Sequence, residues 1–268
     1  MNKGELQGNH NYQLSTFNSQ LSTLNFQLSF DNYQSKHGFG RFAPKAVLFD
    51  MDGVIYDSMG GHSVSWHDAM AAEGISMEYA DAYRFEGMRG VETIRLLARQ
   101  QWHRDISDSE AAAMYARKAQ AFAAYCMQHP VSLMPGIRKL MQQLKDDGMK
   151  ICVVTGSAQK ALLDRLHSDL QGLVSEELTV TALDVAHGKP APEPYLKGMQ
   201  KCGLEAWECI VVENAPLGVR AAVAARCFTI AANTGPLADD ALAAEGADII
   251  FPSIAALSRQ WPEFKKAL

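Results

Sequence analysis

The chain is 268 residues long, 47% of them hydrophobic, and carries a net charge of −5 from 25 basic and 30 acidic residues. This content is enough for a sizeable core, and without a basic run the charge argues against nucleic acids and anionic membranes as partners. No apolar stretch approaches the roughly 18 residues that span a bilayer, and no secretory signal pattern is present. Five cysteines without metal-like spacing are typical of free thiols in a reducing compartment, so we expect a cytoplasmic protein.

The N-terminal segment differs in composition from the rest of the chain. Residues 1–44 are rich in Gln, Asn and Ser and repeat a Gln-Leu-Ser unit within YQLSTFNSQLSTLNFQLSF. Polar low complexity of this kind buries too little apolar surface to offset the entropy of ordering the chain. We therefore expect a disordered polar tail over residues 1–44, followed by the folded unit.

From Ala46 onward, short apolar runs alternate with helical stretches. The runs have the length and β-branched content of strands buried on both faces, and they span residues 46–50, 150–155, 178–182, 209–213, 228–232 and 248–251. Between them lie stretches such as PGIRKLMQQLKDDG, with Pro135 and Gly148 where a helix would start and stop. The alternation predicts the α/β class, with a doubly wound parallel sheet in a Rossmann-like core.

One long segment interrupts the alternation. Between Met59 and Leu133 the sequence contains amphipathic helical stretches and no convincing strand, which is too much for an ordinary connection. We expect a helical cap domain over residues 59–133, inserted between the two parts of a core domain at residues 45–58 and 134–268. Because parallel sheets bind ligands at the carboxyl ends of their strands, this cap would lie beside the site.

Reactive side chains cluster at the predicted carboxyl ends of the strands. The first strand leads into Asp50 and Asp52, and three further loops add the remaining candidates: Thr155, Gly156 and Ser157, then Lys189, then Glu213 and Asn214. Converging carboxylates repel one another unless a cation compensates them, and Mg²⁺ suits oxygen ligands together with a bound phosphate. One carboxylate as nucleophile, with a second two residues away for proton transfer, fits phosphoryl transfer through an aspartyl-phosphate.

Four motifs in chain order, DMDGV, VVTGS, GKPAPEPY and VVENAPLGV, resemble those of the haloacid dehalogenase superfamily of phosphohydrolases, specifically its β-phosphoglucomutase-like branch. The resemblance runs from about Ala46 to the C-terminus. It implies that Asp50 is the nucleophile and Asp52 the general acid/base. It also implies a phosphate site made by Thr155 or Ser157, the loop at Gly156 and the bridging Lys189. A Mg²⁺ site would be made by Asp50, the Asp52 carbonyl, Glu213 and Asn214.

The metal motif departs from the common pattern. Most relatives carry Glu-Asp where this chain has Glu213 and Asn214. An asparagine can still bind Mg²⁺ through its amide oxygen, but it supplies no charge. We therefore expect weaker metal affinity, with Glu213 contributing more of the binding.

The cap residues point to two different substrates. His62 and Lys118 stand at positions that resemble those of the mutases of the branch, although each also suits an ordinary helix. In FEGMRGVET, however, Glu86 and Gly90 replace a lysine and an arginine of the mutases, and Arg89 is displaced by one position. EGMRG together with VVENAPLG resembles a subgroup that includes inorganic pyrophosphatases, in which Glu86 would lie near a Mg²⁺-loaded leaving group with Lys118 and Arg89 as countercharges.

The main prediction is a Mg²⁺-dependent phosphohydrolase that acts, as a monomer, on inorganic pyrophosphate or a small phosphate ester. The alternative is a β-phosphoglucomutase, which would need a phosphorylated sugar to reorient under the closed cap. A non-catalytic binding protein on the same fold is disfavoured, because Asp50 and Asp52 are both intact.

Overall fold

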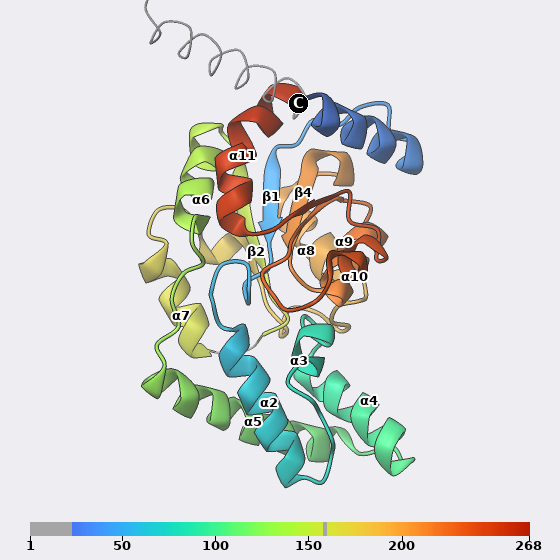
Figure 1. Ribbon diagram of the computed structural model, residues 1–268, viewed down its shortest axis with the longest axis vertical. Helices are drawn as coiled ribbons and strands as arrows, with labels where there is room; N and C mark the ends of the chain where they lie inside the picture. Colours follow the sequence, from blue (N-terminus) through green and yellow to red (C-terminus); the bar gives the residue numbers. More distant parts are fainter. Residues whose placement is uncertain (1–22, 158–159) are drawn as a thin grey trace, which may run out of the picture.

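The computed structural model describes residues 23–157 and 160–268. Its centre is a six-stranded sheet in the order β3-β2-β1-β4-β5-β6, and all neighbouring strands run parallel (Figure 1). The strands are β1 (Ala46–Phe49), β2 (Lys150–Val154), β3 (Thr179–Val180), β4 (Cys209–Glu213), β5 (Phe228–Ala232) and β6 (Ile249–Phe251). The predicted doubly wound α/β class is confirmed.

Helices cover both faces of the sheet because successive strand residues point to opposite sides. In β1, Val47 and Phe49 join one apolar cluster, and Ala46 and Leu48 join another on the opposite face. The first face carries α6 (Ile137–Asp146), α7 (Lys160–Asp169) and α11 (Ile254–Ala267); the second carries α8 (Glu193–Cys202) and α9 (Pro216–Ala224), with α10 (Asp239–Ala243) beside α9 and β6. None of the described helices combines the length and apolar character needed to cross a membrane.

The insertion after β1 folds as a helical cap, as predicted, and lies beyond one end of the sheet (Figure 1). Its helices pack on one another around a separate apolar cluster that includes Met70, Ile94 and Met114. The two connections to the core run side by side, because Tyr56 pairs with Leu133 in an antiparallel bridge. The cap helices are α2 (Met59–Ala72), α3 (Asp81–Arg84), α4 (Gly90–Trp102) and α5 (Asp108–Gln128).

The N-terminal segment differs from the predicted disordered tail. Residues 1–22 lie outside the described residues, but residues 23–37 are helical and dock on the core. Phe26, Phe30 and Tyr33 recur at helical spacing and are buried, and the ring of Phe30 lies 5.3 Å from that of Phe228 in β5. The expectation of disorder over residues 23–44 was therefore wrong. The abundant polar residues occupy the other faces of this helix, so the overall composition does not reveal its one aromatic stripe.

Candidate active site

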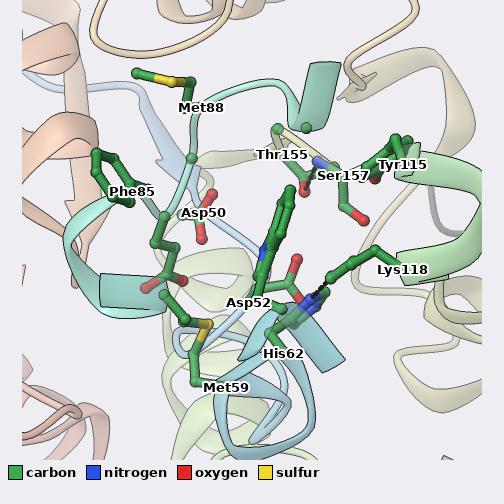
Figure 2. Close-up of a pocket in the computed structure, with 16 residues that line it drawn as sticks. Asp50, Asp52, Met59, His62, Phe85, Met88, Tyr115, Lys118, Thr155 and Ser157 are labelled. Carbon is green, nitrogen blue, oxygen red and sulfur yellow. Dashed lines mark hydrogen bonds and ion pairs between the residues drawn. The ribbon is translucent and has the colours of Figure 1, made fainter. Parts of the chain in front are cut away.

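Four of the polar residues predicted at the strand ends, Asp50, Asp52, Thr155 and Ser157, meet at the carboxyl edge of the sheet, beneath the cap (Figure 2). A cavity of about 50 Å³ lies between them. Core and cap both contribute to its walls. The lining residues are Asp50, Asp52, Met59, His62, Trp66, Ala82, Phe85, Glu86, Gly87, Met88, Gly90, Tyr115, Lys118, Thr155, Gly156 and Ser157.

Lys189 joins the ends of β1 and β4 beneath this cavity. Its Nζ donates to Asp50 Oδ1 at 2.5 Å and to Glu213 Oε1 at 2.6 Å, and its side chain is fully buried. Burial alone would lower the pKa of Lys189, but the charges of Asp50 and Glu213 outweigh it and raise the pKa. Lys189 is therefore a permanent cation between two carboxylates.

Asp50 presents one oxygen to the lysine and leaves the other available. Its Oδ2 is buried and has no hydrogen-bond partner among the described residues. Burial raises the pKa of Asp50 to about 7, with Lys189 opposing the rise and Glu213 adding to it. A carboxylate that lines the cavity, with one oxygen held by the lysine and the other without a hydrogen-bond partner, is suitably placed for nucleophilic attack.

Asp52 lies at the end of a buried polar chain that reaches into the cap. Ser58 donates to Asp52 Oδ1 at 2.6 Å, and His62 Nε2 lies 3.1 Å from the same oxygen. Lys118 Nζ lies 2.6 Å from His62 Nδ1, so the pattern fits a neutral imidazole that accepts from lysine and donates to aspartate (Figure 2). Burial would raise the pKa of Asp52, but His62 and Ser58 outweigh it and hold the pKa below its usual range.

The loop after β2 supplies hydroxyl groups and amides. Thr155 and Ser157 are buried and line the cavity, and the amide of Ser157 donates to Thr155 Oγ1 at 3.0 Å. The backbone of Gly156 passes close to the cap, because a β-carbon at this position would lie 2.4 Å from the carbonyl oxygen of Gly87. The predicted phosphate loop therefore lies where core and cap meet.

Glu86 is the cap carboxylate that enters the site. It is buried, and Asn214 Nδ2 donates to its two oxygens at 3.1 and 3.3 Å. Burial raises the pKa of Glu86 well above its usual range, and the charges of Asp50 and Glu213 add to this effect. The second residue of the Glu-Asn pair thus contacts an acid from the other domain.

Two predicted roles differ from what the structure shows. Arg89 does not line the cavity; its Nη1 donates to the carbonyl oxygen of Ala186 at 2.5 Å, so it is not placed as a countercharge for the substrate. Glu213 was expected to strengthen a metal site, but its oxygens already accept from Lys189, from Tyr195 at 2.6 Å and from the amides of Asn214 and Ala215. Its hydrogen bonds make it a support for Lys189 rather than a free ligand.

Some site residues were missed in the sequence. Tyr115 lies on α5 three positions before Lys118 and shares its face, and this spacing was a usable signal. A β-carbon on Gly90 would lie 2.0 Å from the ring of Tyr115, so this ring occupies the space next to position 90. Tyr195 belongs to the GKPAPEPY motif, but its bond to Glu213 depends on how α8 packs against the sheet.

Several oxygens of this site could serve as ligands for a divalent cation. Among the described residues no three His, Cys, Asp or Glu side chains form a metal site by themselves. The predicted set, however, includes an amide and a backbone carbonyl. Asn214 Oδ1, like Asp50 Oδ2, is buried without a hydrogen-bond partner in the described part of the chain. Two unpartnered oxygens of this kind fit a hard cation.

Two buried carboxylates two residues apart and a buried lysine, all beneath a helical cap, fit an enzyme that transfers phosphoryl groups from small molecules. The model of the haloacid dehalogenase-like hydrolases matches residues 44–226, and the chain belongs to this family. This confirms the resemblance drawn from the four motifs.

Individual relatives agree with this assignment. The chain is 31% identical over 189 residues to hexitol phosphatase A of Escherichia coli K12, covering 70% of this chain and 83% of that protein. It is 24% identical over 232 residues to beta-phosphoglucomutase of Bacillus subtilis, covering 82% and 97% respectively. A solved structure of a candidate beta-phosphoglucomutase from Bacteroides vulgatus superposes with a TM-score of 0.86 at 41% identity, covering 92% of this chain and 99% of that one. The chain is thus an enzyme of the phosphatase and phosphomutase type.

Proposed function

We propose that the protein is a Mg²⁺-dependent phosphohydrolase that cleaves inorganic pyrophosphate or a small phosphate ester. The observation that carries this proposal is the small size of the closed site. The cavity of about 50 Å³ is small beside the roughly 300–1,000 Å³ that is typical of ligand pockets. The ring of Tyr115 fills the space beside Gly90, where the mutases are expected to carry an arginine. A small substrate therefore fits better than a hexose phosphate that must turn around.

The reaction would proceed in two displacements. In the first, a carboxylate oxygen of Asp50 bonds to phosphorus and the bond from phosphorus to the leaving oxygen breaks. Asp52, whose proton affinity would rise beside the negative charge of the bound phosphate, supplies the proton that the leaving oxygen needs. In the second, water attacks the aspartyl-phosphate, Asp52 takes its proton, and phosphate leaves Asp50. Lys189 and the loop of Thr155 and Ser157 would hold the phosphate oxygens during both steps.

Mg²⁺ would be held by Asp50, the backbone carbonyl of Asp52 and Asn214. When bound, it would offset the negative charge on the phosphate oxygens. Glu86 would supply from the cap the carboxylate that Asn214 does not carry, because the two side chains are in contact. This division of the ligand set between core and cap suits a substrate that binds together with its metal.

A second candidate is a β-phosphoglucomutase. It is favoured by the series of polar contacts that runs from Lys118 through His62 to Asp52, since His62 and Lys118 stand at the mutase-like positions. It is also favoured by the relatives that carry this name. The small cavity argues against it, because the phosphorylated sugar would have to reorient within the site.

A substrate panel with Mg²⁺ separates the two candidates. We expect kcat/KM for pyrophosphate to exceed that for β-glucose 1-phosphate supplied with a bisphosphate primer, and Tyr115→Ala to shift the ratio toward the sugar phosphate. Formation of glucose 6-phosphate faster than release of phosphate would establish the mutase instead. In a calorimetric titration of the chain, Glu86→Gln should weaken Mg²⁺ binding about 10- to 100-fold. The exposed cap variant Glu78→Gln serves as the control.

A further inference from the structure

The contact between cap and core depends on few side chains. The cap helices pack mainly on one another, so the closed arrangement relies on the two connections, on the contact of His62 with Asp52, on Tyr83 beside Gly235, and on the segment 86–92, which reaches the core loops. Small polar interfaces of this kind open readily unless specific contacts hold them. Individual hydrogen bonds in this segment can therefore decide how often the site is closed.

Two residues of this segment, Arg89 and Glu92, form hydrogen bonds to one core loop, residues 186–188. Arg89 Nη1 donates to the carbonyl oxygen of Ala186 at 2.5 Å, and Glu92 Oε2 accepts from the amide of Gly188 at 3.3 Å. The two side chains also lie 3.8 Å apart, between Arg89 Nη1 and Glu92 Oε1. The cap thus supplies one hydrogen-bond donor, Arg89, and one acceptor, Glu92, to the backbone of the core loop.

This core loop, residues 186–188, leads directly to Lys189. Gly188 is buried, and a β-carbon there would lie 2.9 Å from the amide nitrogen of Arg89 and 2.6 Å from its Cγ. The cap backbone also crosses the lysine itself, since a β-carbon on Gly87 would lie 2.7 Å from Lys189 Cδ. The cap backbone therefore packs closely against Gly188 and against the side chain of Lys189, with no room for a β-carbon at Gly188 or at Gly87.

We propose that Arg89 and Glu92 form a latch that holds the cap closed over the Lys189 loop. They are positioning residues, because they bind the protein backbone outside the cavity and act on the reaction through cap closure. Removing the latch should lower the fraction of closed molecules without changing the groups that meet the substrate. The kinetic test of this proposal rests on the proposed function, whereas the exchange test below does not.

Amide hydrogen exchange of the full chain, followed by NMR without ligand, reports the latch directly. The amides of Ala186 and His187 donate to Glu193, a core residue, at 2.7 and 2.9 Å, and only the next amide, that of Gly188, donates to the cap. We expect Arg89→Ala and Glu92→Ala to speed exchange at Gly188 about tenfold. The amides of Ala186 and His187 should keep their rates, which provides an internal reference in the same loop.

Two further variants sharpen this exchange test. Glu92→Gln keeps an oxygen that can accept from Gly188, and should retain most of the protection. Arg95→Ala removes the same charge from α4, the helix that follows Arg89, but Arg95 pairs with Asp108 within the cap and should leave exchange unchanged. Unchanged exchange at Gly188 in both alanine variants, or equal acceleration at all three amides, would overturn the latch.

The kinetic test distinguishes a latch from a substrate ligand. A latch residue should lower kcat/KM by the same factor, about tenfold, for pyrophosphate and for an aryl phosphate, because it touches neither leaving group. A loss confined to pyrophosphate would instead make Arg89 a countercharge for the leaving phosphate. If the wild-type chain hydrolyses neither compound, the proposed function fails, and the exchange rates still decide the latch.

Discussion

Replacing Lys189 with methionine would remove the only group that neutralises two buried carboxylates in the described structure. Lys189 Nζ lies 2.5 Å from Asp50 and 2.6 Å from Glu213, and the exposed fractions of the three side chains are 0%, 4% and 1%. Methionine preserves most of the apolar stem, so the change removes charge more than volume. Asp50 and Glu213 would then repel each other in a site from which water is largely excluded.

The expected loss of stability follows from this burial. Removing one partner from a buried ion pair costs about 3–5 kcal/mol, because the remaining charge keeps its desolvation penalty. For a chain of this size each kcal/mol lowers the melting temperature by about 2–4 °C, so Lys189→Met should melt about 6–20 °C below wild type. The surface pair of Lys45 and Glu208 has the same 2.6 Å length, but Lys45 is 60% exposed, and Lys45→Met should cost at most about 1 kcal/mol.

Thermal and urea unfolding at pH 7.5 in the presence of a chelator measure both variants. Adding Glu213→Gln to Lys189→Met should restore part of the loss, because it removes one of the uncompensated charges. A melting temperature of Lys189→Met within about 2 °C of that of Lys45→Met would correspond to a stability difference of less than about 1 kcal/mol. Such a result would mean that the two carboxylates do not depend on this cation. The assignment of Lys189 as their shared counterion would then be refuted.

Three further predictions concern the core, the nucleophile and pH. Phe30→Ala should destabilise the fold by about 3–5 kcal/mol in urea unfolding, whereas Leu28→Ala, at an exposed position of the same helix, should change little. Asp50→Asn should abolish turnover while the protein stays folded by circular dichroism; residual hydrolysis would contradict the aspartyl-phosphate. Burial raises the pKa of Asp248 to about 6, so its ionisation destabilises the fold above that pH. Asp248→Asn should therefore add about 1–3 kcal/mol at pH 7.5, a gain that fades as the pH falls through 6 toward 4.

The sequence predicts the sheet and the core of the site for the same physical reason. Parallel strands buried on both faces appear as continuous apolar runs, and their carboxyl ends must share one edge. Asp50, Thr155 and Lys189 therefore had to lie near one another once the strands were recognised. The N-terminal helix was missed because composition was weighed before periodicity, although Phe26, Phe30 and Tyr33 carry the helical spacing.

The direction of long side chains was harder to predict than the strand ends. Arg89 stands one position from Gly90, where the mutases are expected to carry an arginine, and charge alone suggested that it would face phosphate. Which way it points depends on how the cap docks on residues 186–188, and this docking joins segments far apart in the sequence. Glu213 illustrates the same difficulty, since its hydrogen bond from Tyr195 depends on the packing of α8.

Closure of the cap and binding of a cation should favour each other in this site. Closing places Glu86 near three other carboxylates, and burial together with these charges makes the ionised form costly, as the strongly raised pKa of Glu86 shows. A cation at Asp50 Oδ2 and Asn214 Oδ1 would lower that cost, so by linkage the closed cap would bind the cation more tightly by the same factor. Arg89 and Glu92 oppose the same repulsion from outside the cavity, because their backbone contacts add no charge to the site. In the proposed magnesium site, Asn214 supplies an oxygen but no charge, and Glu86 would add a carboxylate only when the cap is closed, so metal binding would depend on the cap.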